Sequence, residues 1–448
     1  MKKLALAFFV FFLALLNLAQ GEERKAHPVI LISIDGLRPD FVLNADHYGL
    51  KIPNLRLLVQ RGSFASGVHG VLPTVTYPSH TTLVTGVSPA RHGIEANTTF
   101  DPLNRNFEGW YWYAEDIKVP TLWDSAADAG LSVANIHWPV TVGARITYNL
   151  PQIWRAGTAD DRKLLRSLST PGLLSSLERE LGAYADGQSE SIESDENRGV
   201  FAVRLIQEKR PDLTLAYFTA LDHTEHETGP FSQQSASVLE RIDAIVGRLT
   251  QAAQETFKGQ AIIAVVSDHG FIETRHQLNL IGAFRDAGLF KFDSQNKDQV
   301  SSWDATVWPS GGSAAIVHRD PANQEILNKV KTLLNGLAAD PTNGIDQILD
   351  QQEIRKQGGF STASFVVSLR PGYKFARGWS GPLVSETPTT GMHGYVPSQP
   401  EMLSVFFVAG PGIAAGTSIG EIDMRDIAPT LAHLLGITLS SAEGKTLF

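Results

Sequence analysis

Short apolar runs of strand length recur along the chain and alternate with amphipathic stretches of helical period. The runs cover residues 29–34, 131–137, 213–219, 261–267 and 402–410. The amphipathic stretches cover residues 53–61, 171–181, 235–253 and 323–337. A strand that is apolar on both faces needs cover on both faces, and the connecting helices of a parallel sheet supply it. The pattern predicts an α/β fold with a mostly parallel central sheet and helices on both faces.

Three segments depart from this alternation because they are richer in Gly, Pro, Asn and aromatic residues. They cover residues 97–119, 140–170 and 340–391. Neither an internal repeat nor a low-complexity linker divides the chain. We interpret the three segments as lid insertions that cover a site, rather than as separate domains.

The first 21 residues have the order of a secretory signal peptide. Lys2 and Lys3 precede the apolar run LALAFFVFFLALL, and small residues follow near Ala19 and Gly21. The run is shorter than the roughly 17–25 residues of a spanning helix. We therefore expect residues 1–21 to be removed, and the mature protein to be periplasmic or extracellular without a stable membrane anchor. An uncleaved anchor is the alternative.

Charge and cysteine content limit the partners and the metals. The formal net charge is -9 and no long basic run occurs, which argues against a nucleic-acid-binding patch. The sequence contains no cysteine, so disulfides cannot stabilise an exported form. Any metal site must use histidines and carboxylates, a donor set that suits zinc or manganese.

Three predicted strands each end in, or lead into, an aspartate: Asp35, Asp222 and Asp268. Ligand sites of open α/β sheets form at the carboxyl ends of the strands. Each aspartate alone could be an ordinary helix cap. Three histidines accompany them in the sequence: His226, His269 and His393. The combination favours a metal centre at this edge of the sheet.

The spacing within DHTEHETGP supports this interpretation. Asp222 and His226 are four residues apart, so on a helix they share one face and can bind one ion. His223 lies on another face and is expected to be structural or solvated. His393 stands near Gly391 and Gly394, which allow close backbone approach, although an ordinary glycine turn has the same sequence.

The stretch PTVTYPSHTTLVTGVSPARHGI, residues 73–94, is crowded with hydroxyls. Ser79 and His80 look like a Ser–His pair only in the sequence, because neighbours seldom point at each other and no G-x-S-x-G elbow surrounds Ser79. We expect His80 to pack or hydrogen-bond behind this loop. His92, His276 and His433 are interpreted as structural.

Six motifs follow one another in a fixed order: ISIDGLRPDF, PTVTYPSHTTLVTG, HGIEANTTFDP, DHTEHETGP, VSDHGF and GMHGY. Together they resemble the nucleotide pyrophosphatase/phosphodiesterase family of the alkaline phosphatase superfamily, from about Val29 to the C-terminal region. The resemblance implies an alkaline-phosphatase-like fold and one phosphodiesterase catalytic domain over residues 22–448. SHTT stands where NHYT is frequent in the family, and Tyr77 where phenylalanine is frequent. Neither difference touches a metal ligand.

The resemblance also implies two Zn²⁺ ions per chain, bridged by the reacting phosphate. One ion would be bound by Asp35, Asp268 and His269, with Thr76 on the same ion. The other would be bound by Asp222, His226 and His393. Thr76 would then be the nucleophile and would form a covalent phospho-threonine intermediate. Asn97 matches the asparagine that binds a phosphate oxygen.

The substrate class follows from charge and aromatic content. A phosphate monoester carries one more negative charge than a diester, and no obvious spare cation lies near Thr76 in the sequence. Tyr77 is expected to line the base or leaving-group pocket, together with aromatics of the segment around Trp110. The prediction is a small-molecule, nucleotide-type phosphate diester or pyrophosphate.

Two other functions stay open as alternatives. One is a phosphomonoesterase on the same fold, and the other is a non-catalytic exported binding protein. A sulfatase would need cysteine or serine where Thr76 stands. A phosphomutase would need a serine nucleophile and a cytoplasmic location.

Overall fold

The computed structural model describes residues 26–103, 105–106, 109–155, 158–185, 187, 189–293 and 299–448. The predicted signal peptide at residues 1–21 lies outside this part of the chain. Within it, none of the helices combines the length and the apolar character that crossing a bilayer requires.

An eight-stranded sheet forms the centre, in the order β18-β2-β17-β7-β1-β6-β4-β5. Its strands are β1 (Val29–Ile34), β2 (Ser63–Phe64), β4 (Val133–Ile136), β5 (Tyr148–Leu150), β6 (Leu213–Phe218), β7 (Ile262–Val266), β17 (Phe406–Ala409) and β18 (Thr417–Ser418). The pairs from β7 through β1, β6 and β4 to β5 are parallel, and β17 is antiparallel to β7 and to β2. The predicted α/β class with a mostly parallel sheet is confirmed.

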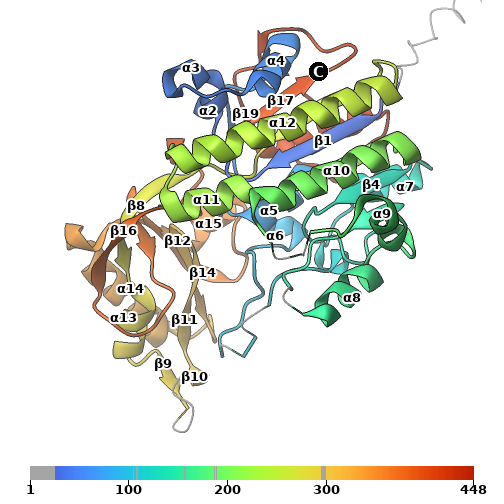
Figure 1. Ribbon diagram of the computed structural model, residues 1–448. Coiled ribbons are helices and arrows are strands. Elements are labelled where there is room, and N and C mark those ends of the chain that lie inside the picture. Colours follow the sequence, from blue (N-terminus) through green and yellow to red (C-terminus); the bar gives the residue numbers. More distant parts are fainter. Residues whose placement is uncertain are drawn as a thin grey trace, which may run out of the picture.

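Alternate residues of β1 face two different apolar clusters. Ile30 and Ile32 belong to a cluster with α4 (Pro53–Arg61), α10 (Ile192–Lys209) and α12 (Gln233–Thr256). Val29 and Leu31 belong to a cluster with α5 (Thr76–Thr85), α7 (Leu122–Asp128) and α16 (Ile427–Leu434). Because side chains alternate along a strand, the sheet is covered on both faces. Figure 1 shows α10 and α12 side by side across the sheet near β1.

A second group of strands lies after β7 in the sequence. A four-stranded antiparallel sheet has the order β11-β12-β14-β13, and a three-stranded sheet has the order β15-β8-β16. These strands are β8 (Ile272–Leu278), β11 (Ala305–Ser310), β12 (Ser313–His318), β13 (Ile345–Asp350), β14 (Ala363–Leu369), β15 (Gly372–Phe375) and β16 (Val384–Met392). They share an apolar cluster with α13 (Leu280–Asp286) and α14 (Gln324–Ala338). Figure 1 shows them grouped at the lower left.

Residues 340–391, predicted as a lid insertion, supply β13 and β14 to the four-stranded sheet and β15 and β16 to the three-stranded sheet. The remaining helices are α2 (Pro39–Leu43), α3 (Ala45–Tyr48), α6 (Pro89–His92), α8 (Ala159–Leu168), α9 (Leu173–Leu181), α11 (Ala220–Thr228) and α15 (Gln351–Gln357). Two small pairs complete the strands: β3 (Gly67–His69) with β19 (Glu421–Asp423), and β9 (Phe290–Phe292) with β10 (Val300–Trp303).

Candidate metal centre

Three neighbouring strands bring the aspartates together at one edge of the central sheet. Asp35 follows β1 directly, and Asp268 comes two residues after β7. Asp222 lies in the first turn of α11, which begins just after β6. The strands β7, β1 and β6 are adjacent and parallel, so their carboxyl ends lie together, as the sequence predicts.

The ligand atoms of Asp35, Asp268 and His269 all lie within 4.8 Å of one another. His269 Nε2 is 3.1 Å from Asp268 Oδ2 and 3.4 Å from Asp35 Oδ1. Like charges held this close in a buried site strongly favour a bound cation. This group coincides with the first ligand set that the family resemblance implies.

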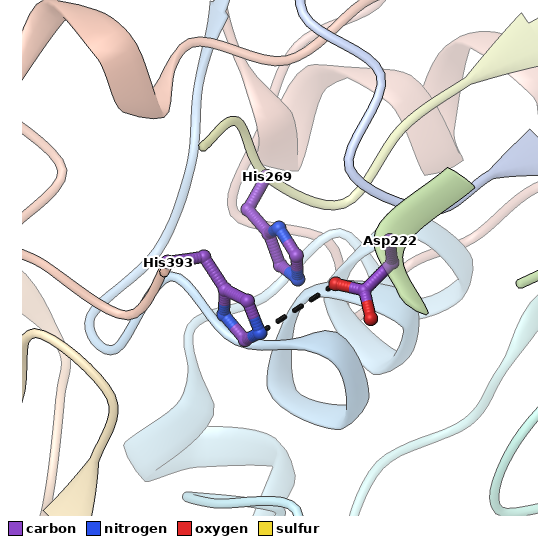
Figure 2. Close-up of side chains that lie close together, drawn as sticks. All are labelled: Asp222, His269 and His393. Atoms are coloured by element: carbon purple, nitrogen blue, oxygen red, sulfur yellow. Dashed lines mark ion pairs between the residues drawn. The ribbon is translucent and has the colours of Figure 1, made fainter. Parts of the chain in front are cut away.

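A second group consists of Asp222, His269 and His393 (Figure 2). His393 Nε2 is 3.7 Å from Asp222 Oδ1, and the rings of His393 and His269 stack with centroids 3.7 Å apart. His226 Nε2 lies 3.5 Å from Asp222 Oδ2 on the same face of α11, as the four-residue spacing predicts. The six side chains therefore meet in one place, and His269 belongs to both groups of ligand atoms.

Each of the three histidines presents the same nitrogen to the site. The Nδ1 atoms of His226, His269 and His393 lie 3.2 Å from the carbonyl oxygens of Gly391, Gly270 and Thr74, respectively. A proton on Nδ1 donates to the carbonyl and leaves the Nε2 lone pair for a metal. Burial lowers the pKa of all three, that of His226 to about 4, so the neutral, metal-binding form is favoured.

In two of the buried carboxylates, Asp35 and Asp268, one oxygen accepts hydrogen bonds from the protein and the other does not. The Tyr217 hydroxyl donates to Asp35 Oδ2, and the backbone N–H groups of Gly36 and His269 donate to Asp268 Oδ1. The opposite oxygens, Asp35 Oδ1 and Asp268 Oδ2, have no hydrogen-bond partner within the described residues, nor do Asp222 Oδ1 and His269 Nε2.

Unpartnered buried oxygens are costly unless a cation binds them. Burial, with the repulsion of neighbouring carboxylates, raises the pKa of Asp35 and of Asp222. The donor set, its buried position and its orphaned atoms fit a metal-binding site.

The start of α5 is connected to this site through His80. Thr76 is the first residue of α5 and is 7% exposed. Its carbonyl oxygen lies 2.8 Å from His80 Nδ1, which is 3.6 Å from Asp268 Oδ2, and His80 Nε2 is 2.8 Å from Ser33 Oγ. Burial lowers the pKa of His80 to about 3, so this ring is a neutral support. The expectation that His80 hydrogen-bonds behind the loop is confirmed.

Ser79 and His92 are both set back from the metal-binding residues. Ser79 is 0% exposed, and His92 contacts Thr82 Oγ1 and the N–H of Ile94 within its own loop. The structural role predicted for His92 is confirmed.

Asn97 lies beside the start of α5. Its Oδ1 accepts the N–H of Tyr77 at 2.8 Å, which fixes the orientation of the amide. The Nδ2 group is then the part of Asn97 that can donate to an anion. Because Tyr77 follows Thr76 directly, the Asn97 side chain lies beside the Thr76 backbone. A donor in that position is well placed to stabilise a phosphoryl oxygen.

The aromatic residues divide into core and surface. Tyr77 is 1% exposed, and its hydroxyl donates to Gln152 Oε1 at 2.8 Å. Its ring is tilted against Trp110, which stacks on Trp154 with centroids 4.3 Å apart. Contact of Tyr77 with a substrate stays a prediction. Trp123 is buried in an apolar cluster against the central sheet.

Two cations that the sequence argument did not identify lie on the His226 side of the site. Lys374 Nζ donates to Thr390 Oγ1 at 2.8 Å, and Thr390 precedes the glycine whose carbonyl contacts His226. Arg377 follows two residues after β15 and is exposed. They come to the site because β15 and β16 both pair with β8, and no motif near Thr76 could have indicated this.

The fold and the buried His/Asp cluster together describe an α/β protein with a candidate metal site at the carboxyl edge of its central sheet. Comparison with known families then shows that the chain belongs to the type I phosphodiesterase/nucleotide pyrophosphatase family, which matches residues 29–396. Members of this family hydrolyse phosphoric ester bonds, and the protein is a hydrolase of that type.

Individual relatives are distant but match over most of their length. The cattle (Bos taurus) bis(5′-adenosyl)-triphosphatase ENPP4 is 23% identical over 96% of this chain and 83% of its own. Human (Homo sapiens) ectonucleotide pyrophosphatase/phosphodiesterase family member 5 is 24% identical over 97% of this chain and 80% of its own.

Solved structures show the same fold. Human ENPP5 superposes with a TM-score of 0.65 at 22% identity and covers 92% of this chain and 95% of its own. An inactive murine ENPP5 variant, with threonine replaced by alanine and AMP bound, gives 0.66 at 21% identity and covers 94% and 97%.

Proposed function

We propose that the protein is an exported two-zinc phosphodiesterase/nucleotide pyrophosphatase that works through a covalent intermediate on Thr76. One observation carries the proposal. Among the described residues, buried ligand atoms without hydrogen-bond partners converge near the start of α5, where Thr76 is the first residue and Tyr77 donates to Asn97. Membership of the phosphodiesterase family supports the same chemistry. The proposal treats residues 22–448 as one catalytic domain and residues 1–21 as a signal peptide.

Two ligand sets accommodate two ions. We assign Asp35, Asp268 and His269 to one ion, which Thr76 would also contact, and Asp222, His226 and His393 to the other. Bound zinc supplies positive charge that lowers the pKa of a hydroxyl and offsets the charge of phosphoryl oxygens. His269 belongs to both groups of ligand atoms, so the residues that would hold the two ions lie side by side.

The residues of the chain then divide the reaction between them. Thr76 Oγ attacks phosphorus, the bond from phosphorus to the leaving oxygen breaks, and the leaving group departs with that oxygen. Water later attacks the same phosphorus and releases the Thr76 oxygen. Asn97 Nδ2 donates to a non-bridging oxygen throughout. His80 acts as a positioning residue through the Thr76 carbonyl.

The nucleotide class of substrate rests on the names and titles of relatives. One is named a bis(5′-adenosyl)-triphosphatase, and a structural neighbour is described as bound to AMP after an inactivating replacement of one threonine. The first supports a nucleotide-type substrate, and the second supports a threonine that is needed for activity.

The decisive assay compares two aryl esters under one set of conditions. A 5′-nucleotide aryl diester should give a higher kcat/KM than the matching aryl monoester. The reverse preference would support the phosphomonoesterase alternative. The cations Lys374 and Arg377 favour that alternative, because a monoester carries one more negative charge than a diester. Turnover of neither ester by zinc-loaded protein would support a non-catalytic binding protein instead.

A further inference from the structure

Helix α11 begins with a cap that another helix provides. The first N–H groups of a helix have no acceptor within the helix itself. Among the described residues, the Thr219 side chain does not cap α11. Instead, Asp195 Oδ2, in the first turn of α10, accepts the N–H of Thr219 at 2.9 Å and that of Ala220 at 2.8 Å. The position of the start of α11 therefore depends on one carboxylate of α10.

Arg198 holds that carboxylate in place. Its Nη1 group donates to Asp195 Oδ1 at 2.8 Å and to Thr219 Oγ1 at 3.2 Å, and its Nη2 group donates to the Ser189 carbonyl. The side chains of Asp195 and Arg198 are both 0% exposed. The pair thus connects the start of α10, the segment before it and the start of α11 in one buried network.

A buried ion pair of this kind is a poor source of stability. Removing two charges from water costs about as much as their attraction returns, and apolar pairs of similar volume are often as stable. The network has a second consequence, because the helix that it holds carries two of the proposed ligands. Asp222 comes two residues after Ala220, and His226 follows one turn later.

The remaining proposed ligands come from other elements. His393 follows β16, against which α11 packs, and the other ligand set follows β1 and β7. A displaced start of α11 would move Asp222 and His226 together, while the other ligands stay in place. Loss of the partners that orient metal ligands typically lowers metal affinity by about 10–100-fold.

We propose that Asp195 and Arg198 are positioning residues that set the zinc affinity of the Asp222–His226–His393 set through the start of α11. The inference rests on the proposed function, because it takes two bound zinc ions as given. It predicts that loss of the pair weakens one zinc site and spares the other. A role in stability alone would not distinguish between the two sites.

Two double variants, studied by zinc titration of the chelated protein, test the pair. Asp195→Ala with Arg198→Met removes both charges and leaves no unpaired charge in the core. It should weaken one zinc site about tenfold or more and the other less than about twofold. Asp195→Asn with Arg198→Met keeps an oxygen that can accept the two N–H groups. Its affinity at the weakened site should lie between those of the first variant and the wild type.

A third background identifies the weakened site. Asp222→Ala leaves only the Asp35, Asp268 and His269 set complete. Adding the Asp195→Ala and Arg198→Met replacements to it should change the remaining zinc affinity less than about twofold, because that set does not depend on α11.

Asp243 supplies a matched control. It is 1% exposed and, from α12, it accepts the N–H groups of Asn54 and Leu55 at the start of α4. This is also a cap from another helix, but α4 carries none of the proposed ligands. Asp243→Ala should lower the Tm of the zinc-free protein, because a helix cap is lost, and should change neither zinc affinity more than about twofold.

Three results would overturn the inference and leave the proposed function intact. They are equal weakening of both zinc sites in the double variants, an unchanged zinc affinity in the variant with asparagine, and a loss of zinc affinity in Asp243→Ala as large as in the double variants. The second result applies even where the variant with alanine does not fold. Wild-type protein that binds fewer than two zinc ions would overturn the proposed function as well.

Discussion

At the level of single residues, one turn of α5 contains two hydroxyls in very different surroundings. Thr76 is 7% exposed and its carbonyl oxygen lies next to His80, which faces Asp268, whereas Ser79 is 0% exposed. A reacting hydroxyl has to reach the substrate, so the proposed function assigns this role to Thr76 and not to Ser79.

Replacement of Thr76 should therefore separate chemistry from folding. Thr76→Ala should lose about 10³-fold or more in kcat while keeping its bound metal, because only the attacking oxygen is removed. Thr76→Ser should keep part of the activity. Two measurements check this prediction: the rate of diester turnover, and the metal content of each variant by elemental analysis. Ser79→Ala is the control, and an inactive Ser79→Ala beside an active Thr76→Ala would contradict the assignment.

Much of the site was accessible from sequence because its residues lie in short local patterns. Asp35 ends an apolar run, and Asp222 and His226 have helical spacing, so their convergence could be predicted. The closeness of His269 to Asp222 and His393 could not, because it depends on how β7 and the segment after β16 pack. Lys374 and Arg377 were missed for the same reason.

At the level of secondary structure, the prediction succeeded where one segment carries its own signal. Strand β1 and helix α4 have the predicted bounds because an uninterrupted apolar run and a proline-initiated amphipathic stretch each specify one local conformation. The strands from β8 to β16 were missed. Several of them are stabilised by pairing partners far along the chain, such as β12 with β14 and β8 with β16.

The segment that follows β16 is the structural element on which the second ligand set depends. Gly394 has a φ of +84°, and a Cβ built there would lie 1.7 Å from the Ser310 carbonyl oxygen. The next residue, Tyr395, is fully buried. A side chain at position 394 must therefore move the backbone that carries His393.

Gly394→Ala should consequently reduce both the amount of bound metal and the activity, although it alters no ligand. We expect at least one ion per chain to be lost or strongly weakened, measured by zinc titration of the purified protein. Gly336→Ala, in the last turn of α14 with open space around the added Cβ, should leave metal binding unchanged. Full metal retention in Gly394→Ala would show that this loop tolerates the strain and that His393 is positioned by other contacts.

At the level of the whole molecule, the metal centre joins two separately packed parts. Asp35, Asp222 and Asp268 come from the central sheet, whereas His393 follows β16 of the second group of strands. The two parts have different apolar clusters. Ions bound between them would link both parts, so their removal should be felt in the stability of the whole chain as well as in catalysis.

Chelation should lower the thermal stability, and the loss should grow as the pH rises from about 5 to 8. Burial raises the pKa of Asp35, Asp222 and Asp268. Without metal, the folded state therefore binds these protons more tightly than the unfolded chain, a stabilisation that is present at low pH and is lost as the pH rises through the raised values. Metal needs the ionised carboxylates, so protons compete with it at low pH.

The difference in Tm between zinc-loaded and chelated protein, followed by calorimetry at several pH values, measures this linkage. Zinc at a hundred times its Kd should stabilise by about 2.7 kcal/mol. In the double variant Asp35→Asn, Asp222→Asn the difference in Tm should be small and should depend less on pH, because two of the three carboxyl groups with raised pKa are gone and both ligand sets are incomplete. If the difference in Tm between zinc-loaded and chelated wild-type protein stayed constant or shrank toward pH 8, metal and protons would not be competing for these carboxylates.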